Sequence, residues 1–531
     1  MADWQGPPLE RLVRRAETLA GSWGARARLS TTLGQERAIL RLFGVHGLDG
    51  SGQPLAGRAV DRYMSGRSGR LAAGIALPFA MGLLEYDLGP QELALDAASG
   101  AVDLGMEAEL LSESDRRATA ESEATRLAEA ALDRIDANRT ARRELVDVMG
   151  DPGRPWIGAS LVDSSIERAL QEASELVGAS ADLVRVRVPL GRELAEQLED
   201  AGVEVSTRQA RTTGEPTPVG SQRGLADLRA TLDEAAAQRR AYVRLATAAP
   251  ALSAPEQAVV AAFERIDVME ADPVGEIVEQ GVDPDRAIAD HAFAHWLLQR
   301  AGVQLLVGAG PLVVAPDLVR GFPSDTATRS GRALAMQLLS VILARRNGFA
   351  ADQVIVDALP AWIWDEPEPA TQAIAAVAVR RAALPDHQLS FREPEQPSSR
   401  GANAWPFVLG AALPFAAMST ARGAGSALVL RAPGAGVRER IVSGRVVARV
   451  ANELADAMER PGLRGSALDQ ARAIVAAAES ILQRLADEGW SAVLGQPLGG
   501  ADRGRLGADA VVERSEAFDP FDRRLGANLG R

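Results

Sequence analysis

The stretch Tyr242-Val-Arg-Leu-Ala-Thr247, followed by Pro255–Arg265 and Ile266-Asp-Val-Met-Glu270, places two short apolar, β-branched runs on either side of a helical pattern. A strand, a helix and a second strand in this order predict parallel strands joined by a right-handed crossover. The same alternation recurs along the chain from residue 156 onwards. The apolar runs that carry it are Trp156–Val162, Asp182–Val188, Tyr242–Thr247, Ile266–Glu270, Val303–Val307, Gln353–Leu359, His387–Arg392 and Ala427–Leu430.

Eight such runs over roughly 290 residues match the size of a (β/α)8 TIM barrel. The last two runs are separated by an apolar segment, Trp405–Met418, and by the Gly-rich Arg422–Gly425. A doubly wound open sheet is the alternative, but no predicted strand is followed by the Gly-x-Gly-x-x-Gly turn that binds phosphate in that fold. The predicted fold class is therefore α/β, with a TIM barrel at its centre.

Helical patterns flank the barrel on both sides. Glu10–Arg28 and Ser112–Val148 carry Ala, Leu, Arg and Glu at helical spacing, and this part ends at Gly150-Asp-Pro-Gly153. Beyond Ser443 the helical pattern returns, and we expect the Gly/Arg/Asp-rich end to be a surface segment or a docking arm. The predicted domains are an N-terminal helical accessory domain (1–150), the barrel with the site (151–442) and a C-terminal helical tail (443–531).

The composition excludes several kinds of chemistry within this chain. All 58 basic side chains are arginine, so no lysine is available to form a Schiff base with a carbonyl substrate or with pyridoxal phosphate. Cysteine is absent as well, which excludes thiol catalysis, disulfides and thiolate metal sites. Any covalent amine or thiol chemistry at a site in this chain must therefore come from a cofactor or a partner.

Charge and hydropathy limit the partners. The net charge is −13 and the arginines are scattered among acidic residues, which argues against a nucleic-acid surface. The apolar stretches Leu71–Leu84 and Phe407–Met418 are too short to span a membrane, and each contains a proline. The first residues lack the layout of a signal peptide. We expect a cytoplasmic protein that contacts neither nucleic acid nor membrane.

In a TIM barrel the reaction site is built at the carboxyl ends of the strands. The polar residues expected there form an acid-rich rim that suits an amine-bearing substrate, although any surface loop is polar. These residues are Asp163, Arg187, Thr247, Glu270, Asp272, Asp357, Arg392 and Glu393.

One histidine pair has a spacing that can bind zinc. His291 and His295 are four residues apart on a predicted helix, but no Glu follows the first, as the His-Glu-x-x-His motif requires. The apolar neighbours Phe293 and Trp296 favour packing instead. We therefore predict no metal ligand and assign no catalytic side chain from motifs alone.

Three stretches resemble the α subunit of lysine 5,6-aminomutase in order and spacing. The first is Thr31-Thr-Leu-Gly-Gln-Glu-Arg-Ala-Ile-Leu-Arg-Leu-Phe-Gly-Val-His-Gly-Leu-Asp49. The second, Ala262-Phe-Glu-Arg-Ile-Asp-Val-Met269, enters the predicted fourth strand at a similar distance from Asp290. The third runs from Leu498-Gly-Gly500 to Phe518-Asp-Pro-Phe521. The resemblance therefore spans nearly the whole chain, and its middle block is the most specific.

The resemblance implies a radical isomerase that moves an amino group by one carbon on a diamino acid, of the D-lysine or β-lysine type, in lysine degradation. It also implies two cofactors, pyridoxal phosphate and adenosylcobalamin, shared between this barrel and a smaller B12-binding β subunit in a hetero-oligomer. In that family the β subunit supplies both the lysine for the internal aldimine and the cobalamin motif. A lysine-free α chain therefore agrees with the resemblance, since the cofactors supply the difficult chemistry.

Carried over residue by residue, the resemblance places Asp290 on a substrate ammonium group. A carboxylate suits that position because it forms a charge-assisted hydrogen bond with the amine that does not migrate. The residues that the resemblance places at or near the cofactor phosphate are Arg187, Arg192, Ser221 and Arg400.

Three positions depart from the family pattern. Val188 stands where the family has a phosphate-binding arginine, Glu193 where it has a serine, and Ala248 where it has a tyrosine that stacks on the cofactor ring. Losing such contacts removes about 1–3 kcal/mol of cofactor affinity for each charge-assisted bond. Two interpretations stay open: a working aminomutase with a rebuilt phosphate site, or a non-catalytic or regulatory scaffold that binds a B12-binding β subunit.

Overall fold

A computed structural model describes most of the chain between residues 6 and 521. The described residues are 6–47, 49, 53–65, 69–153, 155–161, 166–186, 222–248, 252–308, 325–358, 363, 368–392, 427–430, 441, 445–446, 461–490, 511–514 and 518–521.

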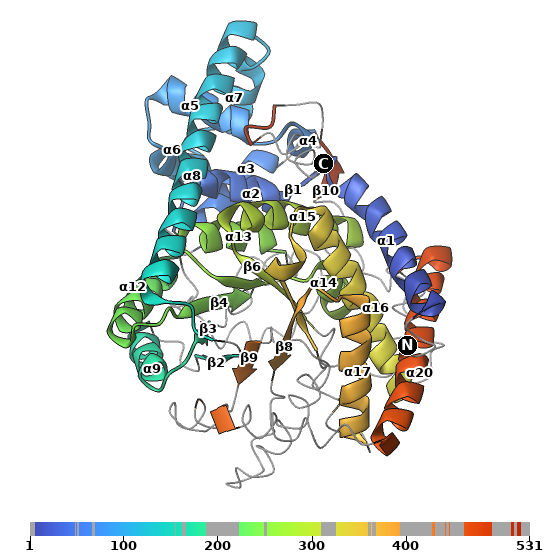
Figure 1. Ribbon diagram of the computed structural model, residues 1–531. Coiled ribbons are helices and arrows are strands. Elements are labelled where there is room, and N and C mark those ends of the chain that lie inside the picture. Colours follow the sequence, from blue (N-terminus) through green and yellow to red (C-terminus); the bar gives the residue numbers. More distant parts are fainter. Residues whose placement is uncertain are drawn as a thin grey trace.

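Eight parallel strands close into a barrel in sequence order, and the last strand pairs with the first (Figure 1). The strands are β2 (Trp156–Ser160), β3 (Leu183–Arg185), β4 (Arg244–Ala248), β5 (Val268–Glu270), β6 (Gln304–Val307), β7 (Val354–Asp357), β8 (Gln388–Arg392) and β9 (Ala427–Leu430). Each overlaps one of the eight predicted runs, so the predicted TIM barrel is confirmed.

Apolar side chains from six strands fill the middle of the barrel. They form one buried cluster: Trp156, Leu183, Ala246, Val268, Leu306 and Ile355. Because side chains alternate along a strand, the residues two positions further on also face the interior, nearer its carboxyl end. At the amino end the Arg244 guanidinium lies 3.6 Å from the centre of the Trp156 ring and pairs with Asp151. The amino half is thus a packed core, and polar groups gather only further along the strands.

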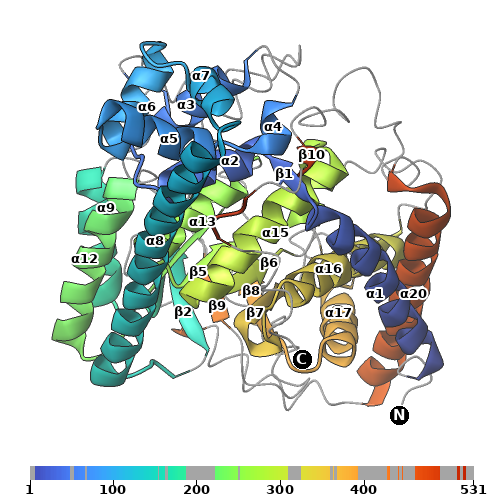
Figure 2. The same ribbon diagram turned by 90° about the horizontal axis from the view of Figure 1, so that it is seen from above.

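Helices follow most of the strands around the barrel. They are α9 (Ile166–Gly178), α12 (Gln222–Arg239), α13 (Ala254–Phe263), α14 (Pro273–Gln280), α15 (Pro284–Ala301), α16 (Thr326–Arg346) and α17 (Pro369–Ala383). A long C-terminal helix, α20 (Pro461–Glu488), packs against α16, α17 and the first helix of the chain (Figures 1 and 2). Among the described residues, no helix combines the length and the apolar character needed to cross a membrane.

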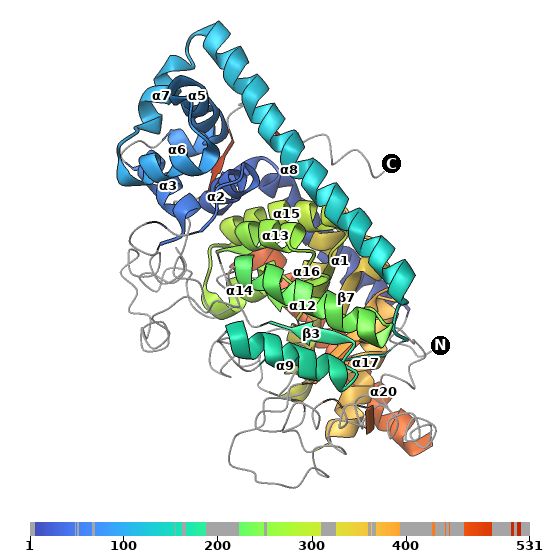
Figure 3. The same cartoon turned by 90° about the vertical axis from the view of Figure 1, so that its left-hand side faces the viewer.

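The N-terminal part is helical and covers one side of the barrel. Its elements are α1 (Pro7–Ala27), β1 (Ser30–Thr32), α2 (Leu33–Leu42), α3 (Leu55–Met64), α4 (Arg70–Ala73), α5 (Ala76–Tyr86), α6 (Pro90–Ser99), α7 (Leu104–Leu110) and α8 (Ser114–Met149). Helix α2 packs on α13, and α8 runs from the N-terminal helices down along the barrel (Figure 3). The 36 residues of α8 therefore join the two parts through a continuous rod.

Buried ionic contacts attach α8 to the barrel. Arg142 of α8 donates to the carbonyl oxygens of Ala301 and Ile266, each at 2.7 Å, and its Nε lies 3.2 Å from Oδ1 of Asp267. The Asp267 carboxylate also accepts from Tyr242 at 2.9 Å and from Arg229 at 3.1 Å. The Asp267 side chain, just before β5, therefore links α8, α12 and the start of β4. Residues at the amino end of a TIM barrel typically serve stability, and this contact set fits that role.

The last described residues of the chain, 511–514 and 518–521, pack against the N-terminal part and the barrel. Strand β10 (Val511–Glu513) pairs antiparallel with β1, and Arg514 lies 3.2 Å from both Glu36 and Asp519. The Phe521 ring packs between Phe43 and Trp296, with centroids 6.2 and 6.0 Å away. Residues 511–514 and 518–521 thus form a clasp across both parts of the molecule; most of them are half-buried, and only Phe521 is buried.

A buried histidine just before β8 makes stability depend on pH. Burial first, and the Arg345 charge second, lower the pKa of His387 to about 4. Between pH 6.5 and 4 the unfolded chain binds a proton that the folded chain excludes, so folding becomes less favourable as the pH falls. We expect this residue to remove up to about 3 kcal/mol of stability over that range. Urea unfolding at several pH values measures this effect. The free energy of unfolding of His387→Phe should fall less between pH 6.5 and 4 than that of the parent, whereas the exposed His46→Gln should behave as the parent does. An equal dependence on pH in His387→Phe and the parent would contradict this prediction.

Candidate active site

An ion pair crosses the interior of the barrel near the carboxyl ends of its strands. Arg185 of β3 and Glu270 of β5 each lie two residues beyond a member of the interior cluster, so both face inward. The Arg185 guanidinium donates to the Glu270 carboxylate, with side chains 13% and 21% exposed. Strand β4 lies between β3 and β5, and the pair passes over it beside Ala246 and Ala248. The small side chains of β4 leave the space that the ion pair occupies.

A second polar group lies on the other side of the interior. Asp357, at the end of β7, is buried and accepts a hydrogen bond from the Ser390 hydroxyl of β8. Glu270 and Asp357 thus bring two carboxylates and Arg185 one guanidinium to the same end of the barrel. This arrangement suits a small ligand that carries both amine and carboxylate groups.

Helices α16 and α17 hold this second group in place. The Gln337 amide donates to the carbonyl oxygens of Gly308 and Asp357, at 2.7 and 2.8 Å, and so ties the ends of β6 and β7 together. Its amide oxygen accepts from the fully buried Arg380 at 2.7 Å. Burial lowers the pKa of Arg380 to about 10 although Asp357 opposes the shift, so this guanidinium stays charged at neutral pH.

Several residues that were predicted at the rim of the site do not face the barrel interior. Thr247 alternates with Ala246 and so faces the helices, where it is buried. Asp272 is the N-cap of α14, and its carboxylate accepts from the amides of Val274 and Gly275. Asp163, Arg187 and Glu393, and the side chain of Arg392, lie outside the described residues.

Two interior residues were missed in the sequence. Arg185 and Ser390 lie inside predicted strands rather than at their ends, where the rim residues were sought. The signal that could have found them is the alternation of polar and apolar residues within the last half of each run.

The histidine pair belongs to a buried network behind β5. His291 Nε2 lies 2.9 Å from the Glu276 carboxylate, and Asp272 accepts from the Ser340 hydroxyl at 2.5 Å. Burial disfavours a charge on His291, but the Glu276 carboxylate outweighs that effect and raises the pKa of His291. Burial lowers the pKa of His295. Within the described part of the chain, no three His, Asp or Glu side chains are placed to hold a metal ion.

Asp290 lies on α15, in the contact between the barrel and the N-terminal part. Its side chain is fully buried; Oδ1 accepts from the Thr32 hydroxyl and Oδ2 from the Arg286 guanidinium. A Cβ atom added at Gly34 would lie 2.9 Å from Oδ1, so α2 approaches this carboxylate closely. Both oxygens are therefore engaged within the protein, and the role of Asp290 in substrate binding stays a prediction.

The residues expected at the cofactor phosphate cannot be placed beside this site. Arg187, Arg192, Ser221 and Arg400 all lie outside the described residues, as do the departing positions Val188 and Glu193. Ala248 is described and ends β4. It lies two residues beyond Ala246 of the interior cluster, so its side chain faces the interior as well. The position expected to carry a stacking ring thus lies beside the Arg185–Glu270 pair.

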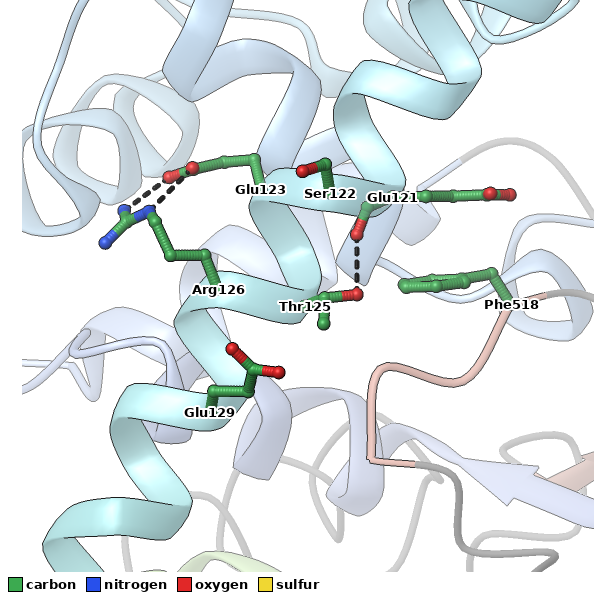
Figure 4. A pocket seen from close by; sticks show the side chains of 7 residues that line it. All are labelled: Glu121, Ser122, Glu123, Thr125, Arg126, Glu129 and Phe518. Carbon is green, nitrogen blue, oxygen red and sulfur yellow. Dashed lines mark hydrogen bonds and ion pairs between the residues drawn. The ribbon is translucent and has the colours of Figure 1, made fainter.

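A surface groove of about 510 Å³ lies along α8 (Figure 4). Phe518 of the clasp faces Glu121 and Thr125 across it. The Glu123 carboxylate is already bonded to Arg126, at 2.5 and 2.8 Å. The groove therefore marks the edge of the clasp, and we assign no ligand to it.

Comparison with known proteins gives the family. Two curated relatives, the lysine 5,6-aminomutase alpha subunits of Fusobacterium nucleatum subsp. nucleatum and Acetoanaerobium sticklandii, are each 26% identical, over 313 and 287 residues. The alignments cover 58% and 54% of this chain, and 58% and 52% of the relatives, so the chain spans little more than half of their length. Among solved structures, the dihydropteroate synthase of Yersinia pestis is similar at 12% identity and a TM-score of 0.34, covering 57% of this chain and 98% of that one.

The family match covers most of the barrel and the N-terminal part. Residues 9–362 match the family described as the TIM-barrel domain of the D-lysine 5,6-aminomutase alpha subunit. The matched region includes α2, the strands β2 to β7 and the interior pair Arg185–Glu270. This chain belongs to the lysine 5,6-aminomutase alpha-subunit family.

Proposed function

We propose that this chain is the α subunit of an adenosylcobalamin- and pyridoxal-phosphate-dependent aminomutase that shifts an amino group by one carbon on a diamino acid. The D-lysine or β-lysine type of substrate is proposed from the family. The observation that carries the proposal is the interior arrangement of Arg185, Glu270 and Asp357 at the carboxyl end of the barrel. A diamino acid has ammonium groups and a carboxylate, and this end of the barrel offers both opposite charges.

The residues divide the binding work by charge. Glu270 and Asp357 bind the ammonium groups of the substrate, and Arg185 binds its carboxylate in place of Glu270. Gln337 and Arg380 orient Asp357 through the β7 carbonyl. The family resemblance assigns the amine that does not migrate to Asp290 instead of Glu270 or Asp357, and this assignment requires the contacts of Asp290 to Thr32 and Arg286 to open.

The donor types at this end also fit pyridoxal phosphate. The Arg185 guanidinium and the Ser390 hydroxyl are donor types that bind phosphate, and the methyl group of Ala248 leaves room for a ring. Arg187, Arg192, Ser221 and Arg400 complete the phosphate contacts in this proposal. When bound, the two cofactors supply the radical and the group that carries the migrating amine, while the protein orients the substrate and excludes water.

A partner is required because this chain has no lysine. We propose a smaller B12-binding β subunit that supplies the cofactor-binding lysine, in a cytoplasmic hetero-oligomer.

One observation favours the second candidate function, a non-catalytic scaffold for that subunit. Ala248 replaces the expected stacking ring, and the Arg185–Glu270 pair passes beside it.

The test is co-expression with the B12-binding subunit, followed by an absorbance scan with pyridoxal phosphate. We expect the visible band of lysine-bound cofactor, a shift when a diamino acid is added, and no activity from this chain alone. Borohydride reduction and mass spectrometry should place the pyridoxyl group on a lysine of the partner. The lysine-free chain is an internal control, because it offers no lysine for labelling.

Each outcome separates the two candidates. A stable complex without the visible band would establish the scaffold function and overturn the enzyme. Activity from this chain without a partner would contradict the two-subunit proposal.

Substitution of Glu270 by Gln should weaken binding of the diamino acid while leaving the cofactor band in place.

A further inference from the structure

A pocket of about 450 Å³ lies within the N-terminal helices, outside the barrel. Arg62 of α3 and Arg70 of α4 line it from one side, and the α6–α7 connection lines it from the other. Its apolar wall consists of Ala59, Ala97, Val102 and Leu104. Pockets of this size hold small organic ligands, and polar groups fix the orientation of such ligands.

Two glycines, Gly100 in the opposite wall and Gly105 in the first turn of α7, make room for the two guanidinium groups. A Cβ atom on Gly100 would lie 2.5 Å from Nη2 of Arg62, and one on Gly105 would lie 1.8 Å from Nη2 of Arg70. Gly100 also has a positive φ of 86°, which favours glycine in any case. Gly105 has no such reason, so its missing side chain is explained by the arginine that occupies the space.

The positive charge in this pocket is not neutralised within the described part of the protein. Arg70 donates to the Tyr63 carbonyl oxygen and lies over the Tyr63 ring, at 5.2 Å, but forms no ion pair there. Arg62 forms no ion pair with a described residue either. Asp103 also lines the pocket, and its carboxylate accepts from the Gly105 amide at 2.8 Å. Two guanidinium groups therefore face one carboxylate.

We propose that this pocket binds a small phosphorylated organic molecule. Arg62 and Arg70 bind the phosphate, because a guanidinium offers paired donors that match the oxygens of a phosphate group. The apolar wall packs against the organic part of the ligand. The site is separate from the barrel interior, and it does not depend on the proposed aminomutase activity.

Calorimetric titration of the full chain with pyrophosphate tests the proposal, at constant ionic strength and with citrate as the carboxylate comparison. We expect saturable binding that is at least tenfold weaker in Arg62→Gln and in Arg70→Gln, and unchanged in Arg126→Gln, which replaces an exposed arginine outside the pocket. Pyrophosphate bound at the proposed cofactor-phosphate site of the barrel should not respond to the Arg62 and Arg70 substitutions. Thermal unfolding of each variant verifies that it is folded. Arg62 is exposed, so Arg62→Gln keeps the test decisive even where Arg70→Gln unfolds.

Three results would overturn the proposal. The first is the absence of saturable pyrophosphate binding by the parent chain. The second is an affinity of Arg62→Gln for pyrophosphate equal to that of the parent chain. That result would mean that Arg62 only packs against the end of α6. The third is citrate binding as tight as that of pyrophosphate, which would exclude a site selective for phosphate.

Discussion

Replacement of Asp267 by Ala should lower the free energy of unfolding by about 3–5 kcal/mol, because it takes a shared carboxylate away from two buried arginines, Arg142 and Arg229. Among the described residues, only Arg229 keeps a second carboxylate partner, Asp233 at 2.7 Å. Arg142 and Arg229 both pair with this carboxylate, at 3.2 and 3.1 Å, and the Leu245 amide donates to it at 2.8 Å. The side chain of Arg229 is 2% exposed, so water cannot replace the lost carboxylate. Urea unfolding followed by circular dichroism measures the loss.

The matched control for Asp267→Ala is Asp469→Ala on α20. Asp469 pairs with Arg472 at 2.9 Å, but its side chain is 75% exposed. An exposed pair contributes little, and we expect a change below about 0.5 kcal/mol. Equal losses in the two variants would show that the contacts of Asp267 do not stabilise the junction between α8 and the barrel.

Substitution of Asp290 by Asn should also cost about 3–5 kcal/mol of stability, since it removes the charge that faces the buried Arg286. Both side chains are at most 1% exposed, and Nη1 and Nη2 of Arg286 have no hydrogen-bond partner in the described part of the protein. The Asp290 carboxylate is therefore the main compensation for that guanidinium. Urea unfolding of the chain, compared with substrate affinity of the complex, measures both roles.

The double variant Arg286→Gln/Asp290→Asn is the control for this pair. Without the arginine charge, the loss of the carboxylate should cost less, so the double variant should be more stable than the sum of the single variants predicts. If Asp290→Asn is as stable as the parent chain but loses much of its substrate affinity, Asp290 does not serve mainly to compensate the Arg286 charge. That result would place Asp290 in the substrate site instead.

The barrel could be predicted from the sequence because each strand carries its own signal. Parallel barrel strands are buried on both faces, so they appear as short apolar runs such as Val303–Val307, whatever lies around them. The candidate site was predicted less completely. Glu270 and Asp357 were found because they end their strands, whereas Arg185 was missed because it lies within one. Its role depends on a partner 85 residues away, which no local pattern reveals.

The sequence by itself determined the succession of eight strands with helices after most of them, and it excluded lysine and cysteine chemistry from this chain. These properties are local or compositional, so they do not depend on how the elements meet. The tertiary structure decided the rest. It paired β10 with β1 across the chain, brought Arg185 to Glu270 over the small residues of β4, and buried Asp290 against Thr32. Such contacts join residues far apart in sequence, and their free energy depends on burial and on the charge that folding places opposite.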